Sequence, residues 1–389
     1  MKILAIETSC DETAVSIIDA REKGGSVSFS VLGNTLLSQT KIHAHYGGVF
    51  PMVAKREHAK ALTPLLIQTL KEAEMHHTNK RLTTHNQQLK EKLKKILERE
   101  TDLYGTLIPL LSKIEKPKLD KIAVTSGPGL EPALWVGINF ARALSEAWNI
   151  PVVPVNHMEG HVLSSLLEKK GERKFLILNF KFPMLALLVS GGHTELVLSK
   201  KWQNYKLIGA TRDDAAGEAF DKVARMLGLP YPGGPEISRV ALKGRLNDEI
   251  KLPRPMIGSK DFDFSFSGLK TAVLYMIKKL GKLSAQKKAD IALEFENAAI
   301  EVLISKTIGA AKIHKAKTIV IGGGVSANEK LRREITLAVN KNLPKTSVLL
   351  PNKSLTTDNA IMIAAAAYFK KPLSKTKLPE MRALGNLSF

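Results

Sequence analysis

The sequence predicts an α/β fold built from two similar halves. Short apolar runs rich in β-branched residues, each closed by glycine or small polar residues, are typical of buried strands. Such runs occupy residues 4–6, 121–125, 185–189 and 318–321. Longer segments with apolar residues at helical spacing lie between them, for example residues 136–148, 217–227 and 285–311. Strands and helices that alternate in this way indicate the α/β class.

Each half begins with a strand and a small-residue turn, which predicts a duplicated architecture of two lobes around a nucleotide cleft. The length of 389 residues and the apolar content of 44% allow a sizeable core in each lobe. We expect an N-terminal lobe over residues 1–155 and a C-terminal lobe over residues 156–389. The last helices of the chain can pack back on the first lobe.

Residues 75–118 differ in composition from the rest of the chain, and we expect them to form a helical insertion in the first lobe. The segment is rich in Lys, Gln, Thr and Glu, and Leu89, Leu93 and Leu97 recur at helical spacing. It carries four lysines close together, at Lys90, Lys92, Lys94 and Lys95. Such a face is usually solvated, but it can also contact RNA, and composition leaves both interpretations open.

Composition excludes several classes of protein. No segment approaches the roughly 20 consecutive apolar residues of a membrane helix, and Met1 leads directly into a strand, so we expect neither a membrane span nor a presequence. Cys10 is the single cysteine, which excludes an internal disulfide and favours a reducing, cytoplasmic setting. The net charge of +21 favours a nucleic-acid partner, although a basic surface can also serve solubility alone.

The strongest local motif is the sequence NHMEGH at residues 156–161. His157 and His161 are four residues apart, so on a helix they share one face and can bind one metal ion. The alternative is two unrelated surface or core histidines. A zinc peptidase helix would carry Glu directly after the first histidine, where this chain has Met158, and this weakens a peptidase interpretation.

A third metal ligand must come from elsewhere in the chain. Asp358 is attractive because it precedes an apolar helical run at residues 361–364. An aspartate in this position is also a favoured helix N-cap, so the cap and the ligand both remain open. Two histidines and one carboxylate leave coordination positions free, which suits Fe²⁺ or Zn²⁺ acting as a Lewis acid on a phosphate or carbonyl oxygen.

Three glycine-containing turns, at residues 189–194, 231–235 and 321–328, are candidates for binding phosphate and nucleoside groups. Glycine lets backbone N–H groups approach oxyanions closely, although Gly-Gly also occurs in ordinary turns. None of the three matches the Walker or dinucleotide fingerprints, which disfavours a P-loop NTPase or a Rossmann dehydrogenase.

Two adjacent carboxylates, Asp11 and Glu12, follow the first predicted strand. They can orient an amine or a metal-bound water, or they can form a solvated hairpin tip, and the sequence favours neither. Cys10 lies in the same turn without an evident histidine partner, so we expect it to serve packing.

Taken together, these motifs resemble the universal tRNA threonylcarbamoyladenosine synthesis family. Its members have the actin-like, sugar-kinase and heat-shock ATPase fold and were once labelled glycoproteases. The resemblance covers nearly the whole chain. Its motifs lie at residues 7–13, 43, 46–49, 126–130, 156–161, 190–194, 214–222, 231–235, 264–270, 323–328 and 358.

The resemblance implies transfer of a threonylcarbamoyl group from threonylcarbamoyl-adenylate to N6 of the adenosine 3′ of the anticodon in tRNAs that read ANN codons, with release of AMP. It implies one divalent metal, Fe²⁺ or else Zn²⁺, on His157, His161 and Asp358, and we expect Asp11 or Glu12 to accept the amine proton. The residues that it implies for the adenylate are Leu188, Val189, Ser190, Gly191, Gly192, Asp221, Gly234 and Asn328.

The Ser-Cys-Asp-Glu-Thr form of the first motif resembles the bacterial and mitochondrial members of the family rather than the archaeal ones, and the expected lack of a presequence favours the bacterial branch. That branch implies three partners, which are tRNA, a paralogous actin-like subunit and a small P-loop ATPase. A mitochondrial relative would act alone as a homodimer and would normally carry a presequence.

The chain departs from the family in two places. The family usually has Glu after the proline that corresponds to Pro51, whereas this chain has Met52, and the role of that carboxylate is in doubt. The insertion at 75–118 is longer than usual and can change how tRNA or a partner docks.

Alternative functions are a metallopeptidase, an ATP-dependent kinase or chaperone of the same fold, and a non-catalytic tRNA-binding subunit. A metal site of two histidines and an aspartate argues against the kinase or chaperone and the non-catalytic subunit.

Overall fold

The computed structural model describes residues 1–78, 87–246 and 248–389, which form two compact units. Unit 1 comprises Met1–Ile177 and Asp358–Ser388, and unit 2 comprises Leu178–Thr357 and Phe389. The boundary expected between residues 155 and 156 therefore lies inside unit 1. The reason is that strands beyond residue 156 extend the first sheet, and that the last α-helix packs on that same sheet.

Unit 1 is built on a sheet whose described strands run in the order β5-β4-β1-β2-β3-β7-β6. β1, β2 and β3 are antiparallel to one another, whereas β4 and β5 continue the sheet on the other side of β1 and run parallel to it. β1 lies between β2 and β4, and this burial on both sides explains its apolar sequence. The strands are β1 (Lys2–Glu7), β2 (Glu12–Lys23), β3 (Ser26–Ser38), β4 (Lys121–Gly127), β5 (Val152–Asn156), β6 (Leu167–Lys169) and β7 (Lys174–Ile177).

Unit 2 contains a second sheet, whose described strands run in the order β10-β9-β8-β11-β12. β8, β9 and β10 are antiparallel, and β11 and β12 follow parallel to β8. This repeats the pattern of β1 to β5, so the duplicated α/β fold class predicted from the sequence is confirmed. The strands are β8 (Met184–Val189), β9 (Thr194–Lys201), β10 (Asn204–Ala210), β11 (Thr318–Gly322) and β12 (Ser347–Leu349).

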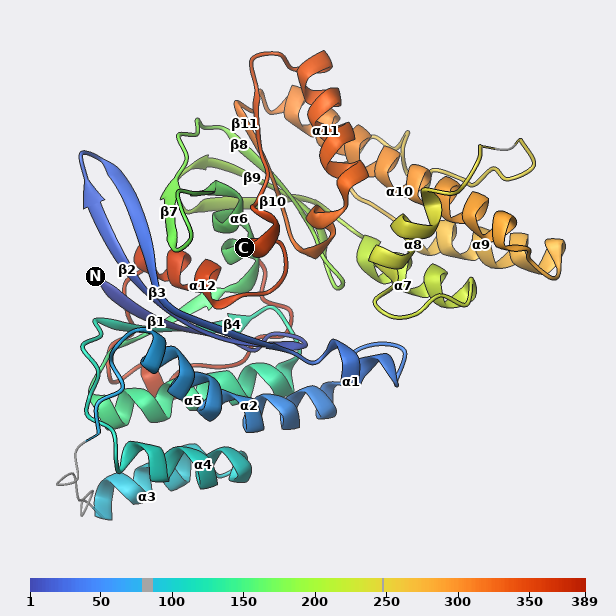
Figure 1. The fold of residues 1–389 in the computed structure, drawn as a ribbon. Coiled ribbons are helices and arrows are strands. Elements are labelled where there is room, and N and C mark those ends of the chain that lie inside the picture. Colours follow the sequence, from blue (N-terminus) through green and yellow to red (C-terminus); the bar gives the residue numbers. More distant parts are fainter. Residues whose placement is uncertain (79–86, 247) are drawn as a thin grey trace. The chain divides into compact units, whose positions relative to one another are not determined.

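Helices cover both faces of the unit 1 sheet (Figure 1). α2 (Pro51–Glu72) and α5 (Glu131–Trp148) lie on one face, and α6 (His157–Leu166) and α12 (Ala360–Tyr368) lie on the other. Leu4 and Ile6 of β1 share a buried core with Leu62, Leu66 and Leu144 of the first pair of helices. Alternate residues of β1 point to the opposite face of the sheet, so this strand contacts the helices on both faces. The short helix α1 (Thr40–Ala44) precedes α2, and a 3₁₀ turn (Leu378–Glu380) lies in the C-terminal segment.

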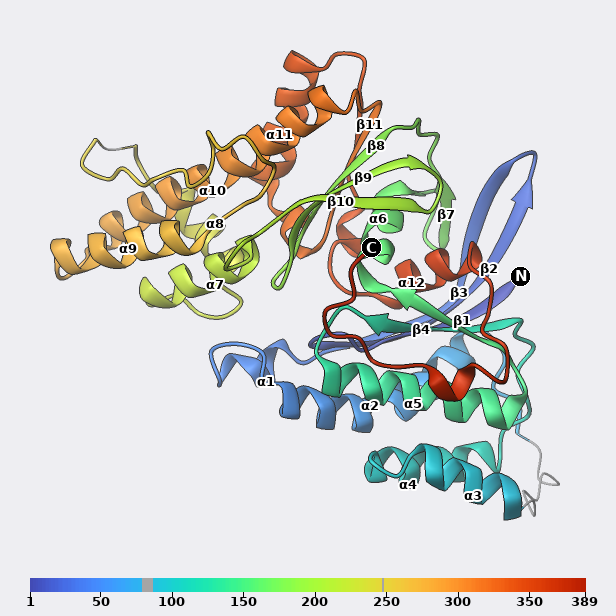
Figure 2. The ribbon, with the colours of Figure 1, turned by 180° about the vertical axis from the view of Figure 1, so that it is seen from behind.

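The described part of the predicted insertion forms two helices, α3 (Gln87–Ile96) and α4 (Thr101–Leu111). They pack beside α5 and α2, as both views show (Figures 1 and 2). Leu93, Leu97, Leu103 and Leu107 join the core of unit 1. Residues 79–86 of the insertion lie outside the described residues. The insertion therefore adds a further helical layer over α2 and α5.

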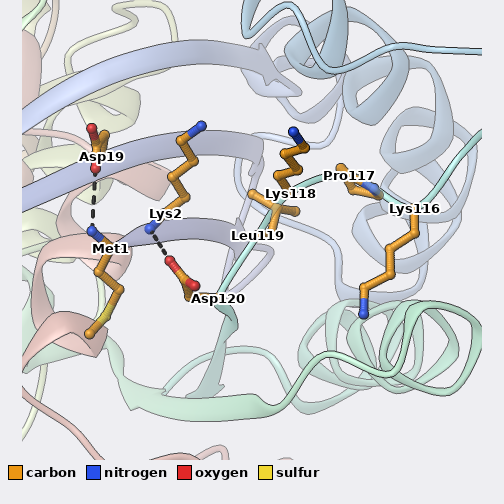
Figure 3. Close-up of a pocket in the computed structure, with 8 residues that line it drawn as sticks. All are labelled: Met1, Lys2, Asp19, Lys116, Pro117, Lys118, Leu119 and Asp120. Atoms are coloured by element: carbon orange, nitrogen blue, oxygen red, sulfur yellow. Dashed lines mark hydrogen bonds and ion pairs between the residues drawn. The ribbon is translucent and has the colours of Figure 1, made fainter.

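Polar contacts hold the start of β1, and two of them involve side chains (Figure 3). The N-terminal amine of Met1 lies 3.3 Å from Asp19 Oδ1, and the Lys2 amide donates to Asp120 Oδ2 at 2.6 Å. A hollow of about 460 Å³ opens beside these residues, next to Lys116 and Lys118. The contacts tie β1 to β2 and to the loop before β4, which fixes the register at the centre of the sheet.

The helices of unit 2 pack on its sheet through a core of β8 and β11 residues with Phe295 and Ile300 of the longest helix. None of the helices in the described residues is both long and apolar enough to cross a membrane. The helices are α7 (Ala216–Met226), α8 (Gly233–Ala241), α9 (Ser267–Leu280), α10 (Ala285–Ile313) and α11 (Glu329–Asn342), with 3₁₀ turns at Gly324–Ala327 and Lys353–Leu355.

Candidate metal centre

The two histidines of the NHMEGH motif lie at the start of α6, directly after β5. Asn156 is the N-cap, and its Oδ1 accepts from the amides of Met158 at 2.8 Å and Glu159 at 3.3 Å. This cap starts the helix at His157 and leaves His161 one turn later on the same face. Both imidazoles are buried.

Asp358 lies two residues before the start of α12 and does not cap it. The N-cap is Asn359, whose Oδ1 accepts from the Met362 amide at 3.0 Å. Of the two roles left open for Asp358 by the sequence, the cap is therefore wrong. α12 also packs closely on α6, because a Cβ added at Gly160 would lie 3.0 Å from Met362 Cγ. This close approach brings Asp358 to the histidines.

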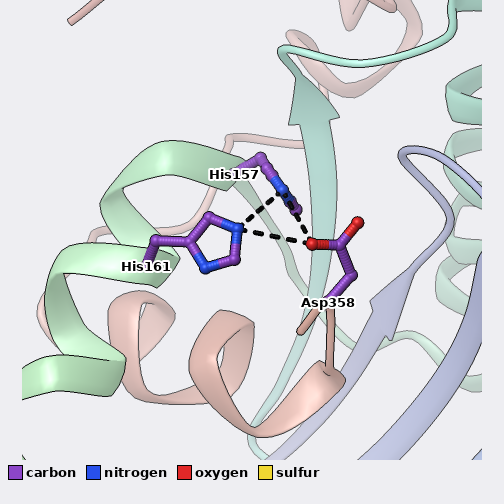
Figure 4. Close-up of side chains that lie close together, drawn as sticks. All are labelled: His157, His161 and Asp358. Atoms are coloured by element: carbon purple, nitrogen blue, oxygen red, sulfur yellow. Dashed lines mark hydrogen bonds and ion pairs between the residues drawn. The ribbon is translucent and has the colours of Figure 1, made fainter. Parts of the chain in front are cut away.

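The three side chains converge on one point (Figure 4). His157 Nε2 and His161 Nε2 lie 3.1 Å apart, and each lies 3.3 Å from Asp358 Oδ1. Ligand atoms about 2.0 to 2.2 Å from one ion are spaced about 3 Å from each other, so this triangle fits a single divalent metal. Within the described residues, this trio forms a group that could hold a metal ion.

A buried carboxylate orients His157. Glu7 Oε2 lies 3.1 Å from His157 Nδ1 and accepts from Thr125 Oγ1 at 2.6 Å, while Oε1 accepts from the Ser9 amide at 2.6 Å. Because Nδ1 donates to Glu7, Nε2 is the nitrogen that faces Asp358 and is left to bind an ion once its proton is displaced. The sequence prediction missed this role of Glu7, although an acidic residue that ends a buried strand was a usable signal.

The charges of the site favour a bound cation. Burial disfavours the charged form of His157, but Asp358 and Glu7 raise its pKa well above the ordinary value. Burial would raise the pKa of the Asp358 carboxyl, yet His157 and His161 lower it. Burial also lowers the pKa of His161. Two carboxylates thus hold one extra proton on His157, and a metal ion can take the place of that positive charge.

Asp11 and Glu12 lie in the turn that leads from β1 into β2. Ser38 Oγ donates to Glu12 Oε1 at 3.3 Å. Burial, followed by the negative charges of Asp358 and Asp11, raises the pKa of Glu12 to about 10. In the metal-free chain Glu12 therefore carries a proton at neutral pH. Glu12 thus lies close enough to Asp358 to feel its charge, and Asp11 lies beside Glu12.

A buried histidine that the sequence analysis did not single out supports this turn. His58 Nε2 donates to the Cys10 carbonyl at 2.9 Å, and its Nδ1 lies 2.7 Å from Thr13 Oγ1 and 3.2 Å from Gln39 Nε2. Gln39 in turn bonds to His43 through its Oε1 at 3.1 Å. The network links the turn after β1 to α1 and α2.

Protonation of His58 is expected to destabilise the protein at acid pH. Burial lowers its pKa from 6.5 to about 4. Between these values the unfolded chain binds the proton and the folded chain does not, so stability falls as the pH falls from about 6.5 to 4, by about 3 kcal/mol in total. Urea unfolding of the wild type and of His58→Gln at pH 7 and pH 4.5 measures this. The variant cannot titrate, so its stability should fall less, and equal losses in both proteins would contradict the assignment.

Unit 2 holds the residues predicted for the adenylate, and its sheet brings two of the glycine turns together. β8 and β11 are parallel, so the turns that follow them lie at the same edge. A Cβ added at Gly323 would lie 2.4 Å from the Val189 carbonyl oxygen, and only glycine allows this approach. Gly191 and Gly192 face open space instead. Leu188 and Val189 are fully buried at the end of β8, so they support the turn that follows from beneath.

The remaining predicted adenylate residues lie around the start of α8. Asp221 Oδ1 accepts from the Gly233 amide at 2.7 Å, and Gly234 faces open space. Asn328 caps α11 through the Leu331 amide and donates to Glu296 Oε1 at 2.8 Å. The side chains of Asp221 and Asn328 thus shape this part of unit 2 in the free chain, and Gly234 leaves backbone accessible.

Comparison with known proteins decides the family. The family model described as tRNA N6-adenosine threonylcarbamoyltransferase matches residues 30–80 and 107–365. This chain belongs to the tRNA N6-adenosine threonylcarbamoyltransferase family. The fold of that family is the actin-like ATPase fold, in agreement with the repeated strand order. Residues 81–106, between the two matched parts, include α3 and the start of α4.

Curated relatives of the same description cover nearly the whole chain. The protein of Persephonella marina is 42% identical over 95% of this chain and 90% of its own length. The protein of Nitrosomonas eutropha is 41% identical over 97% of this chain and 95% of its own length. The protein of Staphylococcus saprophyticus is 40% identical over 94% of this chain and 90% of its own length. The solved structure of T. kodakarensis HypF is similar at 14% identity and a TM-score of 0.47, over 69% of this chain and 42% of that one. That likeness is too distant to bear on function.

Proposed function

We propose that this chain transfers a threonylcarbamoyl group from threonylcarbamoyl-adenylate to N6 of the adenosine 3′ of the anticodon in tRNAs that read ANN codons, with release of AMP. The observation that carries the proposal is the trio of two buried histidines, His157 and His161, with the half-buried Asp358, in a chain that belongs to the family of this activity. No feature of the site favours the metallopeptidase or the kinase.

The trio is proposed to hold one divalent ion, Fe²⁺ in preference to Zn²⁺, because two imidazoles and one carboxylate with free positions suit a ferrous site. When bound, the ion supplies a Lewis acid for a phosphate or carbonyl oxygen of the substrate. The adenylate is proposed to bind in unit 2. Backbone amides of Gly191 and Gly192 hold its phosphate there, and the surroundings of Asp221, Gly234 and Asn328 hold its nucleoside.

The transfer reaction requires an activated carbonyl and a proton acceptor, because the lone pair of the adenine N6 amine is delocalised into the ring and the amine is a poor nucleophile. Burial and the charges of Asp358 and Asp11 favour the protonated form of Glu12 at neutral pH, and we propose that burial keeps this proton in place when the ion is bound. Asp11, its neighbour and hydrogen-bond partner, is therefore the better candidate to accept the amine proton. Protonated Glu12 then donates to Asp11 and orients it.

Substitution of the two carboxylates separates these roles. Asp11→Asn is expected to lower the single-turnover transfer rate by roughly 100-fold or more, because a general base is removed. Glu12→Gln keeps a donor toward Asp11, so we expect a loss within about tenfold. The measurement is transfer from preformed adenylate to tRNA at saturating substrate. A larger loss in Glu12→Gln would reverse the assignment, and near-normal rates in both would remove these residues from the chemistry.

The proposed partners are tRNA as substrate, a paralogous actin-like subunit and a small P-loop ATPase, with a homodimer as the alternative assembly. A tRNA substrate also fits the cytoplasmic location expected from the single cysteine.

The test of the function is the incorporation of labelled threonine into tRNA. The purified chain is combined with an adenylate-generating enzyme, bicarbonate, ATP and the bacterial partner proteins, and tRNA with and without the target adenosine is compared. Label only on tRNA that contains the adenosine supports the proposal. Absence of label with partners of verified activity would overturn it.

A further inference from the structure

Unit 1 contains a cavity of about 860 Å³ on the side of α2 and α5, away from the metal ligands. It is lined by residues of α2, of α3 and the turn after it, of α5, and of the C-terminal segment. The residues from α3 to Glu100 and those of the C-terminal segment lie outside the match to the family, which covers 30–80 and 107–365. Segments outside the family match therefore build two of its walls.

Basic side chains predominate in the lining. Two of them have acidic partners, since Lys92 lies 2.7 Å from Glu146 and Lys55 lies 3.9 Å from Glu100. Two further acids of the lining, Glu98 and Glu131, are exposed. Four basic residues form no ion pair with any carboxylate in the described part of the chain. They are Lys95, Arg99, Arg142 and Arg382.

Arg142 and Arg382 are two of these four basic residues, and their like charges repel each other. Arg142 is half-buried and donates to Asn139 Oδ1 at 3.4 Å, while Arg382 donates to the Pro379 carbonyl at 3.1 Å. Burial and the charge of Arg382 together lower the pKa of Arg142. A guanidinium has five N–H donors, so most donors of this like-charged pair lack an acceptor within the described residues. A bound anion would supply acceptors and relieve the repulsion.

The cavity is tied to the metal centre by short backbone links. Its α5 residues follow Leu130, whose amide donates to the Ser9 carbonyl at 2.7 Å. Arg382 lies two residues before Leu384, whose amide donates to the Ser126 carbonyl at 2.9 Å. Ser9 Oγ in turn lies 3.3 Å from His157 Nδ1. The elements that line the cavity are therefore joined to the turn after β1 and to the end of β4, which also contact the metal centre.

We propose that this cavity binds backbone phosphates of the substrate tRNA, and that α3 and the turn after it add this contact to the family fold. The inference rests on the proposed function, which makes tRNA the polyanionic substrate. The lysines of α3 continue the basic surface from the cavity, as Lys90 and Lys94 are exposed on the same helix. Phosphate contacts position an RNA without reading its sequence, so the cavity serves affinity and orientation.

The test compares two double variants of the full chain. Arg99→Gln with Arg382→Gln removes two exposed charges from the cavity, and Arg245→Gln with Lys341→Gln removes two exposed charges from unit 2 as a matched control. Affinity for unmodified tRNA is measured across a salt series. The cavity variant is expected to bind roughly tenfold more weakly, with a salt slope smaller by about 1 to 2, and the control is expected to bind as the wild type does. In transfer assays KM for tRNA should rise while kcat stays unchanged.

Equal losses in both double variants, or no loss in either, would overturn the proposal. Pyrophosphate and AMP are tested separately by thermal shift. If they stabilise the wild type but not the cavity variant while tRNA binding is unaffected, the occupant is a small phosphate compound and the assignment to RNA is wrong. These binding measurements do not depend on the transfer reaction, so they test the cavity even if the protein transfers no threonylcarbamoyl group. A failure of transfer alone would count against the proposed function.

Discussion

Replacement of His161 by alanine is expected to abolish metal binding and to lower threonylcarbamoyl transfer by roughly 100- to 1000-fold. The variant leaves His157 and Asp358 as the remaining ligands of a triangle with sides of 3.1 to 3.3 Å. Two protein ligands bind a divalent ion much more weakly than three. Loss of a Lewis acid worth several kcal/mol corresponds to a rate loss of about two to three orders of magnitude.

The measurement has two parts, metal content of the purified protein and single-turnover transfer. His314→Ala is a suitable control, because His314 lies at the end of α10 in unit 2 and is not one of the three proposed metal ligands. His161 is fully buried, so the unfolding midpoint of each variant is compared with the wild type. A correctly folded His161→Ala that retains one metal per chain and normal transfer would show that the trio is not the metal site.

Much of the fold could be predicted because its signals are local. The buried runs at residues 4–6 and 185–189 are central strands of their sheets, and their uniform apolar character follows from that position. The boundary between units could not be predicted in the same way. β7 pairs with β3 across more than 130 residues of chain, and the contact of α12 with β1 spans the whole sequence, so neither leaves a local pattern.

In the candidate metal centre, too, the residues with a local sequence signal could be predicted and the others could not. His157 and His161 are helix neighbours, and their spacing indicates the site directly. The choice between cap and ligand for Asp358 depended on the next residue, because Asn359 is an equally good cap and takes that role. The cavity beside α3 was not predicted, since it arises where the insertion meets α5 and the C-terminal segment.

Glu7→Gln is expected to weaken metal binding by about 10- to 100-fold without removing any ligand. Glu7 accepts three hydrogen bonds, from His157, Thr125 and the Ser9 amide. Glutamine has one acceptor oxygen, so its amide group must face at least one of these donors. His157 then loses the bond that fixes its ring, and Nε2 is no longer held toward Asp358.

A positioning role for Glu7 makes two predictions that a merely structural role does not. Excess metal should restore most of the transfer rate, because the ligands remain. The metal affinity of the wild type should fall as the pH falls, because Asp358 and Glu7 raise the pKa of His157 and the proton competes with the metal. Loss of the Glu7 charge lowers the pKa of His157, so in Glu7→Gln the decline in metal affinity should begin at a lower pH.

Glu159→Gln serves as the control, because it changes another buried carboxylate on α6. It should leave the metal affinity and its pH dependence as in the wild type. If Glu7→Gln binds metal with wild-type affinity and pH dependence, the orientation of His157 does not depend on this carboxylate.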